Sequence, residues 1–336
     1  MTDIRLPYLV FLGDERNDSN AKTGFGVRQW RPDACTAQWR LPGGTVDIGL
    51  PHTTPAEAVA KGARSLLIGI APVGGQISPH WIAPICQALE AGLDVVSGMH
   101  TRLGSVDAIR DAASRHGRAL HDIRHSTIRF PVGTGERRSG KRLLTVGTDC
   151  ALGKKYTALA LTQAFQAAGH AATFRATGQT GIMISGAGIA IDAVVADFIA
   201  GAAEWLSPAN NPGHWDVIEG QGSLLHPAYA GVSLGLLHGS QPDALVLCHD
   251  PLRTHIEDYP GFAIPPLGDV MALHLLHARR TNAAARFVGV ALNTSKLSPA
   301  NSQRVIRETS AQQGLPAFDP LRSELSPVVT LATSAC

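Results

Sequence analysis

The chain has 336 residues, 44% of them hydrophobic and 17% charged, with a formal net charge of +2 at pH 7. This composition is typical of a compact globular protein with room for two domains, and it excludes a disordered chain. The net charge is too small and too scattered to indicate nucleic acid or a membrane surface as a partner. The five cysteines lack CxxC spacing, so they predict neither a disulfide framework nor a zinc knuckle.

The N-terminal residues contain one short apolar run, from Tyr8 to Leu12. They carry no cluster of positive charge and no small-residue cleavage site, so they predict a first strand and not a secretion signal. No apolar stretch reaches the length of about 18 residues that a membrane span needs. We therefore expect a cytoplasmic protein.

Predicted strands and helices alternate in the first part of the chain, with short links between them. This order predicts a parallel sheet in a Rossmann-like α/β domain over residues 1–135. The polar, glycine-rich and basic segment 131–142 is the predicted linker. The expected strands are 8–12, 65–71, 94–97 and 120–123, and the expected helices are 57–63, 81–91 and 106–116.

The second part, residues 136–336, predicts another parallel-sheet domain, of the P-loop NTPase-like type. Its apolar runs are nearly continuous, as in strands that are buried on both faces. The expected strands are one that leads into a glycine-rich turn at Gly147, then 173–175, 215–218, 244–248 and 287–292, and the expected helices are 157–168, 191–205 and 270–278.

The most informative segment is the turn from Gly147 to Lys154, which lies between an apolar strand and a helix. Backbone N–H groups in such a turn wrap a phosphate, and the lysine adds a full charge. A metal-binding P-loop has Ser or Thr after this lysine, whereas this chain has Lys155. The predicted cradle has therefore lost a metal ligand and gained a cation; the alternative is a chance glycine-rich turn. The residues expected to bind the cofactor are Gly147, Thr148, Cys150, Ala151, Leu152, Gly153, Lys154, Lys155, Tyr156, Thr157 and Asn293.

Polar residues follow the other strands of this domain as well. Ligands of open α/β sheets bind beyond the carboxyl ends of the strands, so these residues predict one site. The run from Asp216 to Glu219 resembles a Walker B strand. Four histidines fall in the same polar region, but their spacings match no metal motif, so we expect no metal. They are His226, His238, His249 and His255. The residues expected to bind substrate are Arg175, Thr177, Gln179, Gln221, Ser223 and Arg253.

Five blocks of sequence carry a family resemblance. They are Ala21 to Gly24, Thr145 to Tyr156 (TVGTDCALGKKY), Phe174 to Ile184 (FRATGQTGIMI), His214 to Pro227 (HWDVIEGQGSLLHP) and Leu236 to Asp243 (LLHGSQPD). Together they resemble the family of D-glutamate N-acetyltransferases of the DgcN type, long catalogued as a domain of unknown function. The resemblance covers essentially the whole chain. The second domain is also similar to dethiobiotin synthetase, in its fold and two motifs only.

The family resemblance implies acetyl-CoA as the donor and D-glutamate as the acceptor, in D-amino acid metabolism. An α-ammonium has no free electron pair, so the reaction needs a general base. We expect Glu219 as this base, with His226 second and Asp149 third. We expect positively charged side chains to bind the two carboxylates of the substrate, and Arg175 and Arg253 are the candidates. We expect small-molecule substrates as partners, no nucleic acid, no membrane, and assembly into a homo-oligomer.

Two other classes of function stay open at this point. One is an ATP- and Mg²⁺-dependent synthetase or kinase of the dethiobiotin synthetase type, which predicts ADP release. The other is a regulator that binds a nucleotide or coenzyme without turnover.

Overall fold

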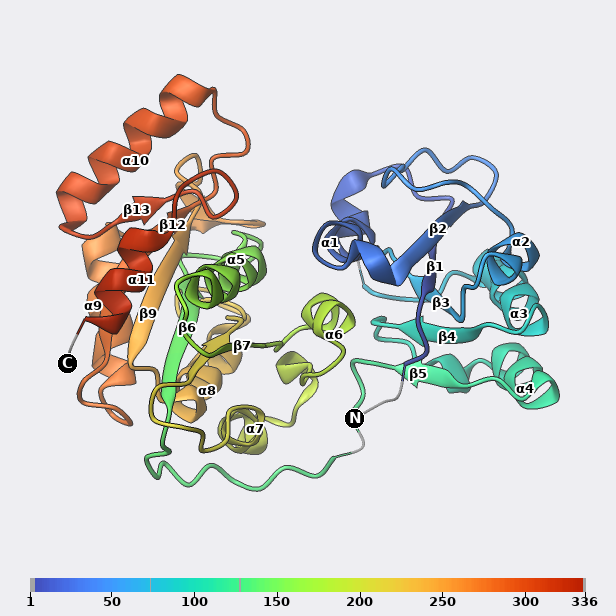
Figure 1. Ribbon diagram of the computed structural model, residues 1–336, viewed down its shortest axis with the longest axis horizontal. Coiled ribbons are helices and arrows are strands. Elements are labelled where there is room, and N and C mark those ends of the chain that lie inside the picture. Colours follow the sequence, from blue (N-terminus) through green and yellow to red (C-terminus); the bar gives the residue numbers. More distant parts are fainter. Residues whose placement is uncertain (1–3, 73, 127, 335–336) are drawn as a thin grey trace. The chain divides into compact units, whose positions relative to one another are not determined.

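The computed structural model describes residues 4–72, 74–126 and 128–334. Contacts divide the chain into two compact units (Figure 1). Unit 1 comprises Met1–Ile128 with Gln179–Ala190, and unit 2 comprises Arg129–Gly178 with Ile191–Cys336. Within the described ranges, we find no helix that is both long and apolar enough to cross a membrane.

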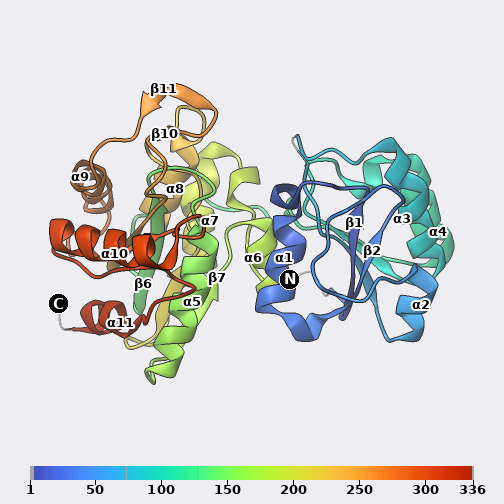
Figure 2. The same cartoon turned by 90° about the horizontal axis from the view of Figure 1, so that it is seen from above.

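Unit 1 is built on a parallel sheet of five strands in the order β2-β1-β3-β4-β5. Helix α1 packs against one face of this sheet, and α3 and α4 cover the other face (Figure 2). The strands are β1 (Tyr8–Gly13), β2 (Cys35–Arg40), β3 (Ser65–Ile68), β4 (Asp94–Ser97) and β5 (Leu120–Asp122), and the helices are α1 (Lys22–Trp30), α2 (Pro55–Ala60), α3 (Ile82–Glu90) and α4 (Asp107–His116).

The strands and helices predicted for this part of the chain are confirmed, with ends that shift by a few residues. Helix α1 and strand β2 were not predicted. The α1 sequence, KTGFGVRQW, contains two glycines, each of which disfavours a helix by about 1 kcal/mol relative to alanine. Tertiary packing overrides this weak local preference, because Val27 is fully buried.

A segment far along the chain, Gln179–Ala190, completes unit 1. It contains α6 (Gln179–Ser185), which packs with α1 on the same face of the sheet. The hydroxyl groups of Thr23 in α1 and Thr180 in α6 share a buried hydrogen bond of 2.8 Å. A Cβ on Gly98 would lie 2.8 Å from Cγ of Gln179, so the absence of a side chain at Gly98 allows this close approach.

Unit 2 is built on a six-stranded sheet in the order β13-β12-β9-β6-β8-β7, with parallel pairing throughout. Helices α5, α10 and α11 lie on one face of the sheet, and α7, α8 and α9 lie on the other (Figure 2). The strands are β6 (Lys141–Gly147), β7 (Ala172–Arg175), β8 (Trp215–Ile218), β9 (Ala244–His249), β12 (Arg286–Leu292) and β13 (Ala317–Phe318), and the helices are α5 (Lys154–Ala167), α7 (Ile199–Leu206), α8 (Ala230–Ser240), α9 (Leu267–Ala278), α10 (Pro299–Gln313) and α11 (Ser326–Thr333).

The predicted α/β class with two parallel sheets is confirmed, but one predicted helix is wrong in its first half. Residues 191–198 form two short 3₁₀ turns, and the α-helix begins only at Ile199. The β-branched Val195 takes up extended backbone, with ψ of 135°, before the second turn.

The predicted linker is held against unit 2. The Glu204 carboxylate accepts hydrogen bonds from the N–H groups of Thr134 and Gly135. Lys141 already begins β6. Despite its basic, glycine-rich composition, this segment therefore makes specific hydrogen bonds with unit 2 and is not a flexible linker along its whole length.

Helices α7 and α8 pack closely because Gly239 has no side chain. A Cβ on Gly239 would lie 2.1 Å from the Ala200 carbonyl oxygen, whereas a Cβ on Gly231, in the same helix, would meet nothing within 4 Å. Gly239→Ala should therefore lower the free energy of unfolding by about 2 kcal/mol, measured by urea unfolding. The matched control Gly231→Ala should leave it unchanged or raise it by up to about 1 kcal/mol. Equal effects of the two substitutions would contradict this packing account.

Candidate active site

The turn after β6 has the backbone of an anion cradle. Ala151 and Gly153 adopt left-handed conformations, with φ of 54° and 99°. Among the described residues, the N–H groups of Ala151, Leu152 and Gly153 have no hydrogen-bond partner. They precede α5, a helix of 14 residues whose N-terminus adds partial positive charge. Unpaired N–H groups at a helix N-terminus are the elements that bind phosphate in other proteins.

Asp149 holds the shape of this turn from inside. Its side chain is buried, and its carboxylate accepts hydrogen bonds from the N–H of Cys150 (2.6 Å), from Arg253 Nη1 (2.8 Å) and from the N–H of Glu257 (2.8 Å). Hydrogen bonds to three donors of the protein therefore occupy the carboxylate oxygens of Asp149. These contacts favour a positioning role for Asp149 over the catalytic role predicted third from the sequence.

Lys154 is buried and curls over the turn. Its ammonium donates to the Asp149 carbonyl oxygen at 2.7 Å. Burial lowers the pKa of this lysine, and the negative charges of nearby groups oppose that effect only in part. A Cβ on Gly220 would lie 3.0 Å from Cδ of Lys154, so this glycine leaves room for the lysine stem. A phosphate in the cradle would supply the counter-charge that this ammonium lacks.

Glu219 lies at the carboxyl end of β8, the strand beside β6. It is 4% exposed, and its Oε2 accepts hydrogen bonds from the N–H groups of Thr177 (3.0 Å) and Gly178 (3.2 Å). Burial raises its pKa to about 7; the charge of Lys155, these two N–H groups and the charge of Lys154 act in the opposite direction. A carboxyl group with a pKa near 7 is suited to accept a proton at neutral pH.

The other acidic residue of the Walker B-like run faces elsewhere. Asp216 pairs with Arg142 and Thr173 in the sheet, so it lies near the amino ends of the strands. Its carboxylate accepts from Arg175 Nε at 2.9 Å and from the Ser207 hydroxyl at 2.6 Å. Of the two acidic residues in this run, Glu219 alone therefore lies at the carboxyl ends of the strands, next to the cradle.

The two arginines predicted to bind substrate carboxylates are both engaged. Arg175 Nε bonds to Asp216, which draws the side chain back toward the amino edge of the sheet. Arg253 uses Nη1 for Asp149 and the Cys150 carbonyl oxygen, and Nη2 for Glu257. Arg253 thus braces the cradle. These contacts count against both predicted roles.

His226 is buried beside the cradle. Its Nδ1 accepts the N–H of Ala228 at 3.1 Å, so the neutral ring carries its proton on Nε2. A ring in this state donates at Nε2 and cannot accept a proton there. The geometry therefore favours His226 as a hydrogen-bond donor over the base that was predicted second.

Asp149, Cys150 and His226 converge on one point. Each offers one possible metal-ligand atom, and these atoms lie within 4.8 Å of one another. The Asp149 carboxylate is already paired with Arg253, and burial raises the pKa of the Cys150 thiol, which disfavours the thiolate that a metal requires. These contacts favour hydrogen bonding over metal ligation, and the expectation of no metal stays a prediction.

The remaining predicted residues divide between the units. Thr177 donates to the Glu219 carbonyl oxygen and accepts from Gln221 Nε2, so these three residues form one network in unit 2. The Thr148 hydroxyl is hydrogen-bonded to His249 Nδ1, and the Thr157 hydroxyl donates to the Gly153 carbonyl oxygen one turn earlier. Gln179 belongs to unit 1, and nothing in unit 2 alone assigns it to the site.

Two further predicted positions show clear local contacts. The ammonium of Lys155 lies 4.5 Å from the centre of the Tyr156 ring. Asn293 follows β12, and its side-chain oxygen accepts from the N–H and hydroxyl of Ser295. His238, which the sequence groups with His226 and His249, lies near the far end of α8 beside His277.

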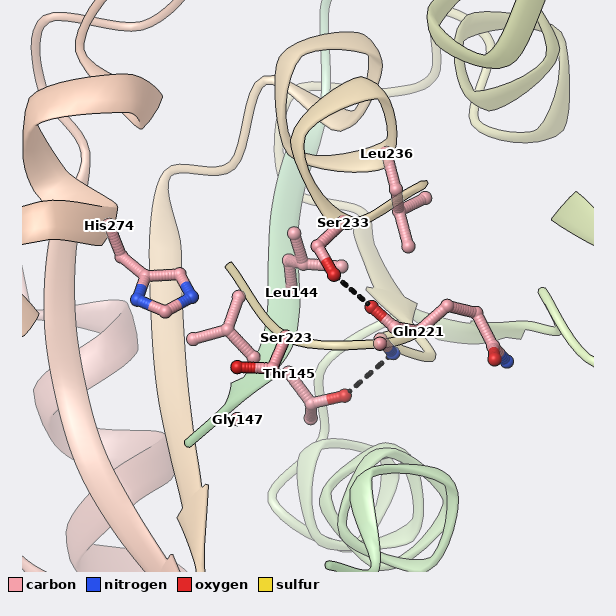
Figure 3. A pocket seen from close by; sticks show the side chains of 11 residues that line it. Leu144, Thr145, Gly147, Gln221, Ser223, Ser233, Leu236 and His274 are labelled. Atoms are coloured by element: carbon pink, nitrogen blue, oxygen red, sulfur yellow. Dashed lines mark hydrogen bonds between the residues drawn. The ribbon is translucent and has the colours of Figure 1, made fainter. Parts of the chain in front are cut away.

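A small cavity lies beneath the loops. It has a volume of about 10 Å³ and is lined by Ser223, Leu236 and His274 among others (Figure 3). Thr145 and Ser233 fix its wall, because the Thr145 hydroxyl accepts the Gly220 N–H and the Ser233 hydroxyl donates to the Gln221 carbonyl oxygen. This volume suits one water molecule at most, so the cavity itself is too small for a substrate.

Comparisons with known proteins assign the chain to a family. A family model described as "Domain of unknown function (DUF1611_C) P-loop domain" matches residues 131–329, and its partner "Domain of unknown function (DUF1611_N) Rossmann-like domain" matches residues 39–126. The chain belongs to the DUF1611 family. These descriptions confirm the Rossmann-like and P-loop character predicted from the sequence.

Two curated relatives of this DUF1611 protein carry the name D-glutamate N-acetyltransferase, which confirms the resemblance seen in the sequence. The relative from Tritonibacter scottomollicae is 47% identical and covers 95% of this chain and 96% of its own. The relative from Pseudoalteromonas sp. is 44% identical, over 97% and 98% of the two chains. The crystal structure of a DUF1611 family protein from Anabaena variabilis is similar with a TM-score of 0.89 and 32% identity, over 98% of this chain and 100% of that chain.

The raised pKa of Glu219 makes stability depend on pH. The folded protein keeps a proton up to about pH 7 that the unfolded chain releases near pH 4.5. The free energy of unfolding should therefore fall as pH rises through this interval, by up to about 3 kcal/mol from this group. Glu219→Gln removes the titration, so its stability relative to wild type should increase from pH 4.5 to 8 in urea unfolding. Parallel pH profiles for the two proteins would contradict the raised pKa.

Proposed function

We propose that this DUF1611 protein is a D-glutamate N-acetyltransferase that uses acetyl-CoA as its donor. The names of the two curated relatives support the activity and the acceptor. The observation in this chain that carries the proposal is Glu219, a buried carboxyl group with a pKa of about 7 on the strand beside an anion cradle. Cytoplasmic location and assembly into a homo-oligomer stay predictions from the sequence.

The cradle would hold the phosphates of the coenzyme. The unpaired N–H groups of Ala151, Leu152 and Gly153 would donate to phosphate oxygens, and Lys154 would add a full charge. Coenzyme phosphates need no metal ion for this mode of binding. Lys155, in the position of the usual Mg²⁺-binding hydroxyl, adds a cation on the same helix end.

Glu219 would act as the general base. Its Oε2 is held by two backbone N–H groups, so we assign proton transfer to Oε1. The carboxylate removes a proton from the α-ammonium of D-glutamate, and the free amine attacks the thioester carbonyl to form the C–N bond. Glu219 passes this first proton to solvent and, ionised again, takes the second proton from the positively charged nitrogen of the tetrahedral intermediate. The oxyanion then collapses, the C–S bond breaks, and the departing thiolate of CoA takes that second proton from Glu219. General base catalysis of this kind contributes roughly 10²–10⁴-fold.

A Mg²⁺-dependent synthetase or kinase is the weaker candidate. Such an enzyme needs a hydroxyl after the P-loop lysine, and this chain has Lys155 there. The charge of Lys155 is also the largest of the interactions that lower the pKa of Glu219, ahead of Lys154. The positive charge of Lys155, acting on the Walker B-like carboxylate, would repel a divalent metal at that place.

Replacing the base should slow the chemical step. Glu219→Gln should lower kcat for acetyl transfer from acetyl-CoA to D-glutamate by roughly 10²–10⁴-fold. In wild type, kcat/KM should rise with pH and level off above about 7, because the base must be ionised. The exposed Glu308→Gln serves as the control and should match wild type. A near-wild-type kcat for Glu219→Gln would rule out its role as the base.

Removing the cradle lysine should affect the donor far more than the acceptor. Lys154→Ala should raise KM for acetyl-CoA by roughly 10-fold or more, since hydrogen bonds to charged groups contribute about 1.5–3 kcal/mol. KM for D-glutamate should change less than about twofold, and the exposed Lys61→Ala should change neither value. Steady-state kinetics with each substrate varied in turn tests this. Equal increases in both KM values would contradict donor binding by the cradle.

A further inference from the structure

Four aromatic rings form a connected row in which His226, the buried member beside the cradle, lies between Tyr229 on one side and Tyr259 and Phe262 on the other. The ring of His226 stacks on that of Tyr229 with centres 4.3 Å apart and planes inclined by 29°, and it meets Tyr259 edge-on at 5.0 Å. Tyr259 in turn meets Phe262 edge-on at 6.2 Å. We call these four residues the aromatic row. Its inner member, His226, is next to Cys150 of the cradle.

The aromatic row passes from the interior to solvent. His226 is 3% exposed, whereas Tyr229 is 51% and Phe262 49% exposed. Tyr229 directly precedes α8, and its backbone packs over Gly222, where a Cβ would lie 3.0 Å from the Tyr229 carbonyl oxygen. One face of the Tyr229 ring stacks on His226, and about half of the Tyr229 side chain stays in contact with solvent, where a further planar group can pack on it.

The hairpin that carries Tyr259 and Phe262 is hydrogen-bonded to the cradle. Tyr259 and Phe262 belong to β11 (Tyr259–Ala263), which pairs with β10 (His255–Ile256) to form a hairpin. The turn of this hairpin contains Asp258, with φ of 66°. The N–H of Glu257, in the same turn, donates to the Asp149 carboxylate, which also shapes the cradle. Asp149 therefore holds both the cradle and the hairpin that carries Tyr259 and Phe262, and Tyr259 in turn packs against His226, on which Tyr229 stacks.

We propose that Tyr229 stacks on the adenine of CoA while the coenzyme's phosphates occupy the cradle; this rests on the proposed function. Adenine is the planar conjugated part of that coenzyme, and stacking of a base on an aromatic side chain strengthens binding by roughly 10-fold or more. The pantetheine arm is a flexible chain without such a plane. D-glutamate has no planar conjugated ring that could stack on the tyrosine.

Fragments of the coenzyme separate the contributions of its parts. We would measure the Kd of CoA, of 3′,5′-ADP and of 4′-phosphopantetheine by calorimetry with wild type, Tyr229→Ala, Tyr229→Leu and Tyr229→Phe. The proposal predicts that Tyr229→Ala and Tyr229→Leu weaken CoA and 3′,5′-ADP by about tenfold, and 4′-phosphopantetheine by less than twofold. Tyr229→Phe keeps the ring and should bind all three as wild type does.

The control variant is Trp205→Ala on α7. Trp205 has the same 49% exposure as Phe262 but contacts Phe130, so its removal should leave all three Kd values unchanged. Equal weakening of all fragments by Tyr229→Leu, selective weakening of 4′-phosphopantetheine, or no change would each overturn the proposal. If the wild-type protein transfers acetyl groups and the Tyr229 substitutions leave all three Kd values unchanged, the stacking alone is refuted. Wild-type protein that binds no CoA refutes the proposed function.

Discussion

The buried carboxylate of Asp149 is the constraint on which the site depends. A turn that presents unpaired N–H groups outward needs an internal group to hold its backbone, and Asp149 does this through Cys150, Arg253 and Glu257. Two of these contacts, those with Arg253 and Glu257, also join the hairpin of β10 and β11 to the cradle. Removing one partner of such a buried ion pair leaves an uncompensated charge, so the cradle, its arginine brace and the hairpin form one energetic unit.

The distribution of charge around this unit supports the proposed CoA site over a site for a nucleoside triphosphate with Mg²⁺. Lys154 and Lys155 both act on Glu219, and burial still raises the pKa of that carboxyl to about 7. The carboxyl can therefore exchange a proton near neutral pH, which a metal-bound carboxylate cannot do. Two lysines and a titrating glutamate suit acyl transfer from a phosphorylated carrier better than metal-assisted phosphoryl transfer.

Local sequence patterns predicted most strands of the two sheets. They could not predict features that depend on contacts between residues far apart in the sequence. The strand 215–218 and the cradle follow from short-range signals, namely apolar runs and a glycine-rich turn. Nothing in the local sequence indicates that α6 packs in unit 1, because the Thr23–Thr180 hydrogen bond joins residues 157 positions apart. The contact between Arg253 and Asp149 was equally hidden from local sequence, since the two residues lie 104 positions apart, and the substrate-binding role of Arg253 stays a prediction. Glu219 was the first choice as base from its strand-end position, and the structure adds the burial that sets its pKa.

The central claim is that this cradle binds the phosphates of coenzyme A without a metal ion. The most direct measurement is calorimetric titration with CoA and with ATP, each in excess EDTA and in millimolar Mg²⁺. The account predicts that CoA binds with the same Kd in both conditions, and more tightly than ATP in either. Binding of ATP that requires Mg²⁺ and exceeds that of CoA would contradict it.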